Sequence, residues 1–566
     1  GGGRSARISL SLAELHTTGL RLHGREADIK FLRTKLHELR GRRDSNKNNI
    51  GSSIITTNNN GVTKRQLRSS FNGGSIITTN NNDVTKSQLR SSYNGAKKDM
   101  PPELLLVAGV SGSGKSALVM RGLADPARKM GVAFAGGKFD LNNRTIALPL
   151  AAFVDAMATL TKFIVANHYV QKIREEIRME FCDVDDMILL LHAMTGCEEL
   201  FPIDEEVFSV DALDRRLRGG DKEAVMRLQY ATRRLLKVIC NNLKGVVLFI
   251  DDLQWSDTAT LDLIRSISLD TEIPSLLIVG SYREEEVSDS HLLALHIREL
   301  GEQRSDAITT ISVKNLSPSI VTSLVAEVLR MEDNEKGVAS LAASVYKKTE
   351  GNAFFVLMFL RHLYDEELIQ YNFGAMAWLW DDSAVSSTMV MQNVATVMIQ
   401  KLKRFQEGYQ NILKVASCLG ASFSTSVITM VVEEILPQTE CASITDCDEI
   451  ASLVTSSVGE FEKDGIWESE SSEDVCRRRF SHDQIQSAAF ELIPLDQRDS
   501  FRGSVGNALI KRLDPDSLED CLFEAVSLQN CDISPMSGDD RKALAKMNLR
   551  TGLKVCKSLP KELKKK

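Results

Sequence analysis

The sequence predicts an α/β domain, a parallel sheet with helices on both faces, followed by a mostly helical region. Three observations predict this fold class. Short apolar runs alternate with helical patterns over residues 99–315, the first run ends in a glycine-rich turn that leads into a helix, and apolar residues recur mainly at helical spacing from residue 316 onward. A chain of 566 residues exceeds what one hydrophobic core usually serves, so we expect several domains.

Composition narrows the class of protein. The net charge of −7 argues against a protein that binds nucleic acid over its whole surface. The ten cysteines are scattered without a CxxC pair, which favours reduced thiols and a cytoplasmic chain. No apolar run reaches the roughly 18 residues that span a bilayer, so we expect no membrane segment. The GGG start and the KELKKK end lead us to expect that the chain is cut from a longer polypeptide.

The first apolar run, Leu104–Val107, leads into the most informative motif. The segment GVSGSGKSA fits G-x-x-x-x-G-K-[ST], the loop that holds phosphates in P-loop NTPases. Its glycines let successive N–H groups point at a polyphosphate, and the following helix adds its positive N-terminal end. Lys115 would reach the β- and γ-phosphates and serve catalysis, and the Ser116 hydroxyl would bind Mg²⁺. A glycine–serine turn without a ligand is the alternative. The residues expected to bind ATP or ADP are Gly109, Val110, Ser111, Gly112, Ser113, Gly114, Lys115, Ser116 and Ala117.

Four later apolar runs predict the other strands of the sheet, at Val132–Asp140, Val246–Ile250, Ser275–Val279 and Ile308–Val313. The run Val246–Ile250 is continuous and rich in β-branched residues, as in a parallel strand buried on both faces. The segments between the runs have helical patterns. Residues 99–315 are therefore predicted to form a P-loop ATPase core.

Charged residues follow two of these runs directly. Ligands bind at the carboxyl ends of strands in open α/β sheets, so we expect Asp251 to hold Mg²⁺ through water and Asp252 to polarise the attacking water. An ordinary turn after a strand is the alternative, because Asp is common there. Arg283 follows the next run and can reach a γ-phosphate. Its alternative is a solvated arginine at the start of the charged loop EEEVSD.

The segments on either side of this core have different patterns. Residues 1–39 hold N-terminal helices, and Gly24-Arg25-Glu26 reads as a turn that starts one of them, with a plain helix cap as the alternative. Residues 40–98 contain a tandem duplication with a 22-residue period, rich in Asn, Thr and Ser, which predicts a disordered insertion or, less simply, a regulatory segment. After the core we expect a helical lid (316–388), a winged-helix-like domain with a hairpin between Gly465 and Phe480 (389–500), and a further helical region (501–566).

Seven strings support a family resemblance when taken in chain order: GRE, GVSGSGKS, GKFD, LFIDDLQWSD, GSYRE, EGNAFF and RFSHDQIQSAAFELI. They resemble the STAND class of signal-transduction ATPases, and more narrowly the origin-recognition-like AAA ATPase module of large multidomain sensor proteins. The resemblance implies a slowly hydrolysing ATP switch whose partners are kinase, cyclase or sensor domains of the same polypeptide. It also implies that residues 501–566 begin a helical-repeat region that binds other proteins.

The same resemblance assigns roles to four residues. Arg25 would border the adenine pocket, Arg283 would sense the γ-phosphate, and Asn352 would belong to a lid segment over the base. His482 would touch the β-phosphate, with a helix cap or a core position as the alternative. The family usually has proline where this chain has Ala353, and proline would stiffen that turn.

Two other functions compete with the switch. A DNA-replication initiator or transcription regulator would read DNA through the winged helix, but the basic residues of Gln392–Phe405 gather only at the end of that segment, so nucleic acid is not the expected partner. A degenerate ATPase would hold nucleotide only as structural support, but the P-loop lysine, both carboxylates and the strand-end arginine are all present.

Overall fold

A computed structural model of the chain divides into two units, which are described separately here. Unit 1 comprises residues 1–139, 149–388 and 559–566, and unit 2 comprises residues 140–148 and 389–558. The structure describes residues 15, 19–52, 101–139, 150–181, 184–194, 196–201, 221–273, 275–387, 394–435, 447–469, 477–513, 518, 521–533 and 536–558.

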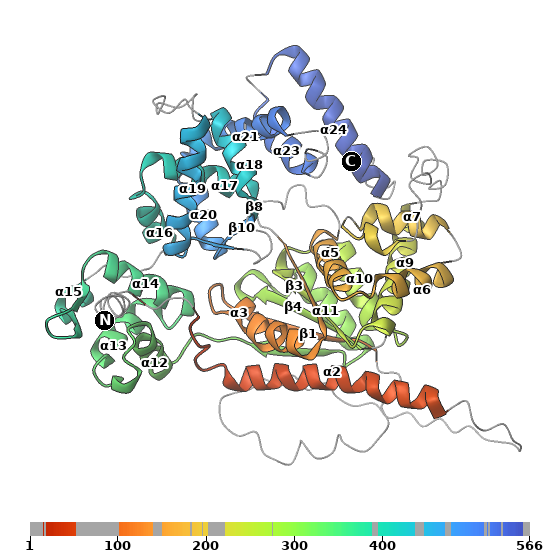
Figure 1. Cartoon of the computed structure of the whole chain (residues 1–566), viewed down its shortest axis with the longest axis horizontal. Helices are drawn as coiled ribbons and strands as arrows, with labels where there is room; N and C mark the ends of the chain where they lie inside the picture. Colours follow the sequence, from red (N-terminus) through yellow and green to blue (C-terminus); the bar gives the residue numbers. More distant parts are fainter. Residues whose placement is uncertain are drawn as a thin grey trace, which may run out of the picture. The chain divides into compact units, whose positions relative to one another are not determined.

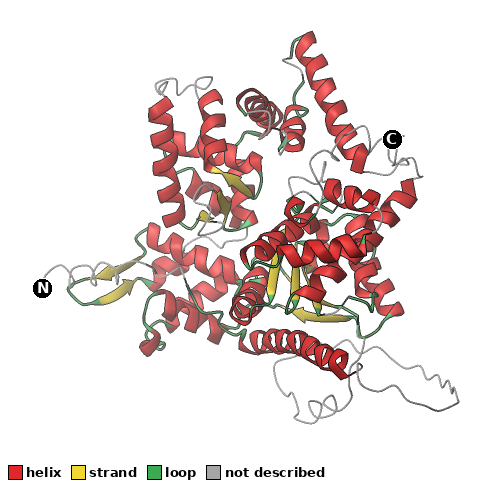
Figure 2. Ribbon diagram, turned by 45° about the vertical axis from the view of Figure 1, so that its right-hand side comes forward, coloured by secondary structure: helices red, strands yellow, loops and turns green. Residues whose placement is uncertain are grey.

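A five-stranded parallel sheet forms the centre of unit 1 (Figures 1 and 2). Its strands lie in the order β2-β3-β4-β1-β5, and every neighbouring pair is parallel. This confirms the predicted fold class. The strand β4 continues past the predicted end at Val279, so that Arg283 is its last residue. The strands are Glu103–Gly109 (β1), Ala133–Lys138 (β2), Val246–Asp251 (β3), Leu276–Arg283 (β4) and Ile308–Ser312 (β5).

Both faces of the sheet are covered by apolar cores. Successive side chains of a strand point to opposite faces, so Leu104 and Leu106 of β1 join one core while Leu105 and Val107 join the other. Every residue of β3 is buried, as its sequence predicted. The first core is covered by Ala151–Ala166 (α5), Asp221–Asn242 (α9), Thr258–Ser268 (α10) and Leu292–Gln303 (α11); the second is covered by Glu26–Ser52 (α2), Lys115–Val119 (α3) and Asp125–Met130 (α4).

The long helix α2, red in Figure 1, starts at the predicted turn. Gly24 has a φ of 70°, a conformation that favours glycine, and the helix begins at Glu26. Leu32, Leu36 and Leu39 bury one stripe of it against the sheet. α2 continues to Ser52, past residue 40, where the sequence predicts the insertion to begin. No proline interrupts residues 40–52, and a helix already formed on a core extends at little cost. The tandem repeat itself lies outside the described residues.

The helix that carries the phosphate loop is not a regular α-helix. Between α3 and α4, residues Met120–Ala124 form a π-helical turn. Gly122 lies in this turn, and a Cβ there would collide with the Leu32 side chain of α2. The backbone of the loop-bearing helix therefore packs closely on the Leu32 side chain of α2, and a larger residue at position 122 would force that side chain to move.

Outside the sheet, the residues of unit 1 that the structure describes form helices and a hairpin. Within the predicted helical lid, Ile369–Asn372 (β6) and Ala377–Trp380 (β7) form an antiparallel pair that the sequence analysis did not predict. Tyr371 pairs with Trp378, and their rings pack edge to face with centroids 5.5 Å apart, a cross-strand contact that favours a sheet. The helices are Val170–Glu180 (α6), Val184–Ala193 (α7), Pro318–Val328 (α12), Ala339–Thr349 (α13), Ala353–Asp365 (α14) and Asp382–Ser387 (α15).

Unit 2 combines helices with a small antiparallel sheet in the order β8-β10-β9. The predicted hairpin is present as Trp467–Ser469 (β9) and Arg477–Phe480 (β10), and Ser422–Ser424 (β8) adds a third strand. Within the described ranges, none of the helices combines the length and apolarity needed to cross a membrane. The helices of unit 2 are Val394–Leu402 (α16), Glu407–Leu419 (α17), Thr425–Ile435 (α18), Cys447–Lys463 (α19), Asp483–Glu491 (α20), Arg498–Arg512 (α21), Leu522–Gln529 (α23) and Gly538–Ser558 (α24).

Candidate nucleotide-binding site

The predicted phosphate loop follows β1 and ends at the first residue of α3. Gly112 and Gly114 have φ values of 76° and 94°, in the left-handed region that favours glycine. A Cβ on Gly112 would lie 2.7 Å from Oδ1 of Asn352, so a side chain at this position is excluded by space as well. The loop is therefore held in a tight curl at the edge of the sheet, next to the start of a helix, where backbone N–H groups can bind an anion.

Lys115 is buried at the base of this loop, with 7% of its surface exposed. Its ammonium group donates hydrogen bonds to the carbonyl oxygens of Gly109 at 2.9 Å and Val110 at 3.0 Å. Burial lowers the pKa of Lys115, the carboxylate of Asp252 opposes that shift, and the charge of Arg283 adds to it. The lysine is thus a positive charge fixed inside the loop.

Ser116 and Asp251 meet across the edge of the sheet. The Ser116 hydroxyl donates to Oδ2 of Asp251 at 2.7 Å, and the Ser281 hydroxyl on β4 donates to Oδ1 of the same carboxylate. Asp251 is the last residue of β3, and β4 lies between β3 and the strand that carries the loop. A hydroxyl and a carboxylate in direct contact are hard oxygen donors, so these residues fit Mg²⁺, which takes few protein ligands and keeps water or phosphate oxygens for the rest.

Asp252 is a buried carboxylate surrounded by donors. Its Oδ1 lies 3.4 Å from Nε of Arg283 and accepts a hydrogen bond from Gln254 at 2.8 Å, while its Oδ2 lies 3.5 Å from Nζ of Lys138. Its φ of 60° is unusual for a residue other than glycine, although Asp tolerates it better than most. The backbone of Asp252 does turn after the strand, as the alternative from the sequence has it. Its side chain, however, points into a cluster of charged and polar groups.

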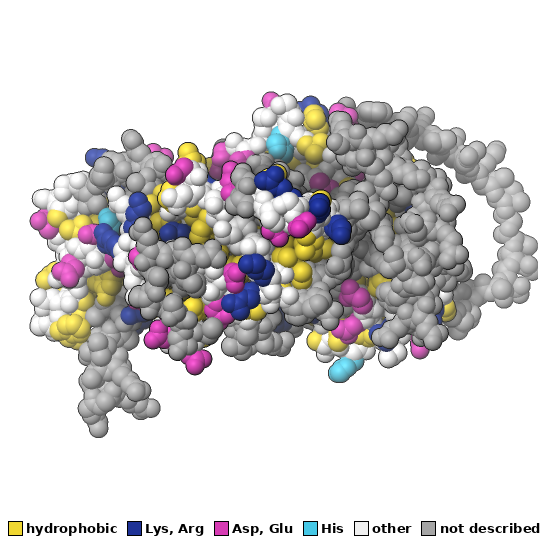
Figure 3. Space-filling model, turned by 90° about the horizontal axis from the view of Figure 1, so that it is seen from above, with side chains coloured by type: hydrophobic (Ala, Val, Ile, Leu, Met, Phe, Trp, Pro, Cys, Tyr) yellow, Lys and Arg dark blue, Asp and Glu magenta, His cyan; other side chains and the backbone are white. Residues whose placement is uncertain are grey.

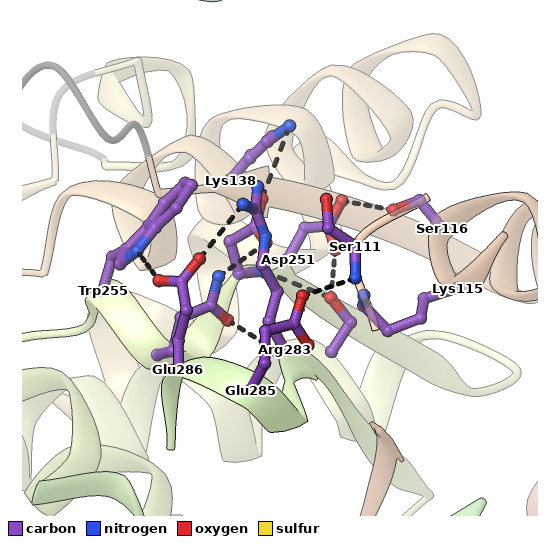
Figure 4. Close-up of polar contacts among 12 residues, drawn as sticks. Ser111, Lys115, Ser116, Lys138, Asp251, Trp255, Arg283, Glu285 and Glu286 are labelled. Carbon is purple, nitrogen blue, oxygen red and sulfur yellow. Dashed lines mark hydrogen bonds and ion pairs between the residues drawn. The ribbon is translucent and has the colours of Figure 1, made fainter. Parts of the chain in front are cut away.

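Arg283 belongs to the same cluster. Its guanidinium lies 4.5 Å from the ring centre of Trp255 and donates to Oε1 of Glu286 at 3.1 Å (Figure 4). Glu286 also accepts a hydrogen bond from the indole of Trp255 at 2.7 Å. Only 11% of the Arg283 side chain is exposed, which excludes the solvated arginine. The contact with a γ-phosphate stays a prediction.

Arg25 and Asn352 contact the backbone of the phosphate loop. Arg25 donates to the carbonyl of Ser113 at 3.4 Å and also to that of Lys314, and burial lowers the pKa of Arg25. The Asn352 amide donates to the carbonyl of Ser111 at 2.8 Å while its Oδ1 caps α14. Asn352 thus lies against the loop backbone itself, and a role over the adenine base stays a prediction.

His482 belongs to unit 2 and is described only there. It is the N-cap of α20, where Nδ1 accepts a hydrogen bond from the N–H of Gln484 at 3.1 Å. This is the capping role that sequence reasoning held as the alternative. Its assignment to a β-phosphate stays a prediction.

Sequence reasoning missed several members of the site. Each of them lies close in sequence to a residue that it identified, or opposite one in the sheet. Gln254 and Trp255 follow the acidic pair, Ser281 precedes Arg283, and Lys138 ends β2 opposite Asp251 in the sheet register. The available signal was position, because a polar residue at the carboxyl end of any strand of a parallel sheet faces the same edge. Glu285 and Glu286, in the 3₁₀ turn Glu284–Glu286 after β4, were treated only as part of a charged loop.

Comparison with known proteins agrees with a nucleotide-binding core. Residues 84–279 match the AAA ATPase domain family. The chain is 22% identical over 502 residues to Hybrid signal transduction histidine kinase G of Dictyostelium discoideum. This match covers 72% of this chain but only 14% of that protein. The matched AAA segment includes the phosphate loop and both aspartates, whereas Arg25, Arg283, Asn352 and His482 lie outside it.

Three solved structures have some likeness to this chain. A Walker-type ATPase of Pyrococcus abyssi has 12% identity and a TM-score of 0.28, covering 68% of this chain and 90% of that one. The Orc1 protein of Aeropyrum pernix, in complex with DNA, has 14% identity and a TM-score of 0.25, covering 69% and 87%. Cdc6p of Pyrobaculum aerophilum has 11% identity and a TM-score of 0.28, covering 69% and 88%.

Proposed function

We propose that this chain binds ATP with Mg²⁺ and hydrolyses it slowly, as the nucleotide-dependent switch of a larger regulatory protein. The observation that carries the proposal is the convergence of two contacts on one sheet edge: Ser116 with Asp251 at 2.7 Å, and Asp252 with Arg283 at 3.4 Å. The match of residues 84–279 to the AAA ATPase domain supports the chemistry, and the likeness to a hybrid histidine kinase supports the larger regulatory protein.

Each residue has a part in this chemistry. Mg²⁺, when bound, would neutralise charge on the β- and γ-phosphate oxygens. Ser116 and Asp251 supply oxygen ligands for it, and Lys115 supplies a fixed positive charge inside the loop. Asp252 orients the attacking water by accepting a hydrogen bond from it, and Arg283 donates to the γ-phosphate oxygens.

The loop also connects the nucleotide to the lid. Asn352 donates to the Ser111 carbonyl, and the N–H of Phe354 donates to the Gly112 carbonyl at 3.1 Å. A change in loop conformation is therefore passed directly to the first turn of α14. A full shift between two lid states requires about 5.5 kcal/mol of differential binding, which a few charge-assisted contacts to a γ-phosphate, at about 1.5 to 3 kcal/mol each, can supply.

Phosphate release by the native chain and by Asp252→Asn tests the hydrolytic role. We expect the variant to release phosphate about 100-fold more slowly while still binding ATP, because removal of a group that positions or deprotonates water usually costs at least that much. Asp262→Asn on α10 is the matched control, since its carboxylate pairs with Arg265 and does not face the site. Equal rates for the native chain and Asp252→Asn would exclude hydrolysis through Asp252.

The basic residues of unit 2 give little support to DNA binding, because several of them pair with acidic side chains. On β10, Arg478 pairs with Glu462 at 2.6 Å and Arg479 with Glu468 at 2.9 Å. Lys401, at the end of the segment that would read DNA, pairs with Asp464 at 3.3 Å. Basic and acidic side chains also alternate over the described surface that Figure 3 shows. Titration with duplex DNA at two salt concentrations tests this alternative, because a phosphate-binding surface loses affinity as salt rises.

A further inference from the structure

A carboxylate already occupies one donor of the phosphate loop. The N–H of Ser111 donates to Oε1 of Glu285 at 2.7 Å (Figure 4). Ser111 is the third residue of the nine that were predicted to bind the nucleotide, so its N–H belongs to the set of donors that the loop presents to an anion. A carboxylate oxygen resembles a phosphate oxygen in charge and in its ability to accept such a hydrogen bond. Glu285 therefore takes a position that a phosphate oxygen can also take.

The neighbours of Glu285 indicate which phosphate is involved. Glu285 lies in the 3₁₀ turn Glu284–Glu286, directly after Arg283 at the end of β4. In the same turn, Glu286 accepts hydrogen bonds from Arg283 at 3.1 Å and from Trp255 at 2.7 Å. The carboxylate thus reaches the loop from the side of the arginine that the proposed function assigns to the γ-phosphate. A diphosphate lacks the group that would approach Glu285 from this side.

We propose that Glu285 is a specificity-determining residue that lowers the affinity for ATP relative to ADP. The proposal rests on the proposed function, because it requires a nucleotide in the loop. A γ-phosphate brings negative charge next to the Glu285 carboxylate and competes with it for the N–H of Ser111, so ATP must displace Glu285 whereas ADP binds with the contact intact.

The displacement also links γ-phosphate binding to the sensor residues. Glu285 and Glu286 are consecutive in a short turn, so a displacement of Glu285 that shifts the turn also changes the position of Glu286 relative to Arg283 and Trp255. ATP binding is therefore expected to change the environment of the Trp255 indole. ADP binding is expected to leave that environment nearly unchanged.

Affinities for ATP and for ADP, each with Mg²⁺, measured by calorimetry on the native chain and on Glu285→Gln, test the proposal. Glutamine keeps the size of the side chain but removes its charge. We expect the Kd for ATP to fall about tenfold in Glu285→Gln and the Kd for ADP to change less than twofold, as for the loss of one charge-assisted contact. Glu284→Gln is the matched control, because Glu284 accepts a hydrogen bond from the Ser312 hydroxyl rather than from the loop; it should leave the ratio of the two constants unchanged.

The outcomes separate this proposal from the proposed function. A native chain that binds neither nucleotide overturns both. A native chain that binds both, with the same ratio of Kd values in Glu285→Gln as in the native chain, overturns only the role of Glu285, and so does a weaker affinity for ATP in the variant. Thermal melting shows whether the variant folds, and Glu285→Ala, with the same expected direction, replaces it if it does not. Trp255→Phe identifies which part of any ATP-dependent fluorescence change comes from that indole.

Discussion

The proposed nucleotide site contains two groups of residues that make different kinds of contact. The strand-end group, Asp251, Asp252 and Arg283, comes from the ends of two neighbouring strands of the sheet, and its charged side chains contact hydroxyls or side chains of opposite charge. The loop-side group, Arg25 and Asn352, comes from segments far away in sequence and bonds to backbone carbonyls of Ser113 and Ser111. The first group presents charge, whereas the second fixes the course of the loop.

This difference has a functional consequence. Charged side chains interact strongly with a group that adds charge, so the strand-end group should distinguish ATP from ADP. Hydrogen bonds to the loop carbonyls stabilise a loop conformation that both nucleotides need. The loop-side group should therefore affect both affinities to the same extent.

Lys115→Ala should have the largest effect, because the lysine lies in the loop that the two groups share. Loss of charge-assisted bonds to two phosphates, at about 1.5 to 3 kcal/mol each, predicts a rise of roughly 100-fold or more in the Kd for ATP and for ADP, measured by calorimetry. Lys129→Ala, an exposed lysine on α4, is the control for removal of a lysine near the same helix. Unchanged affinities in Lys115→Ala would place the nucleotide elsewhere.

Arg283→Gln tests the strand-end group by itself. We expect the Kd for ATP to rise about tenfold and the Kd for ADP to change less than twofold, because only the triphosphate has the group that the guanidinium would contact. Arg265→Gln is the control, since its ion pairs with Asp262 and Glu299 lie away from the loop. Equal losses for the two nucleotides would remove the difference between the two groups.

Asn352→Ser tests the loop-side group. Serine can still cap α14 but is too short to donate to the Ser111 carbonyl, so the helix is kept while one neutral hydrogen bond is lost. At about 0.5 to 1.5 kcal/mol, this loss predicts that the Kd values for ATP and ADP rise together by about three- to tenfold. A change confined to ATP would mean that Asn352 reads the nucleotide rather than the loop. Asn334→Ser, in an exposed turn of the lid, is the control.

The strand-end group was open to prediction because it follows from the sheet. Apolar runs such as Val246–Ile250 define strands, and strands in parallel order end at one edge, so Asp251 and Ser116 had to meet if the fold was right. The loop-side contacts depend instead on how α2 packs against the sheet and on how the first turn of α14 meets the loop. No local pattern reports that packing, and the position of Asn352 against Ser111 could come only from the structure.

Local sequence patterns also failed to predict the contact of Glu285 with the loop and the hairpin β6–β7. Glu285 in REEEVSD has the appearance of a solvated charge, and its contact with the loop depends on the direction of a single turn after β4. The hairpin β6–β7 was missed because helices surround it and its strands are short. In both cases tertiary contacts decided between local alternatives of similar cost.

The smallest predicted effect concerns the segment that precedes Arg25 of the loop-side group. Arg21 and His23 precede Arg25 and bind Glu327 of α12: the N–H of Arg21 donates to both carboxylate oxygens, at 3.2 and 3.3 Å, and the His23 ring contacts Oε2. Burial by itself would raise the pKa of Glu327, but the hydrogen bonds and charges of Arg21 and His23 outweigh it, so this pKa lies below its ordinary value of 4.5. The ionised carboxylate therefore holds the segment that carries Arg25.

The depressed pKa sets the sign of the pH dependence. The contribution of Glu327 is complete above the unfolded-state value of 4.5 and is lost as the pH falls through the lower folded-state pKa. In Glu327→Gln at neutral pH we expect the amides of residues 20–25 to exchange hydrogen about fivefold faster than in the native chain, the loss of about 1 kcal/mol of local stability. The ratio of exchange rates should approach one as the pH falls below 4.5. Glu332→Gln, whose half-exposed carboxylate lies 3.9 Å from Arg21, should leave the ratio near one at every pH. A Glu327→Gln ratio that stays at fivefold in acid would mean that the charge of Glu327 does not hold this segment.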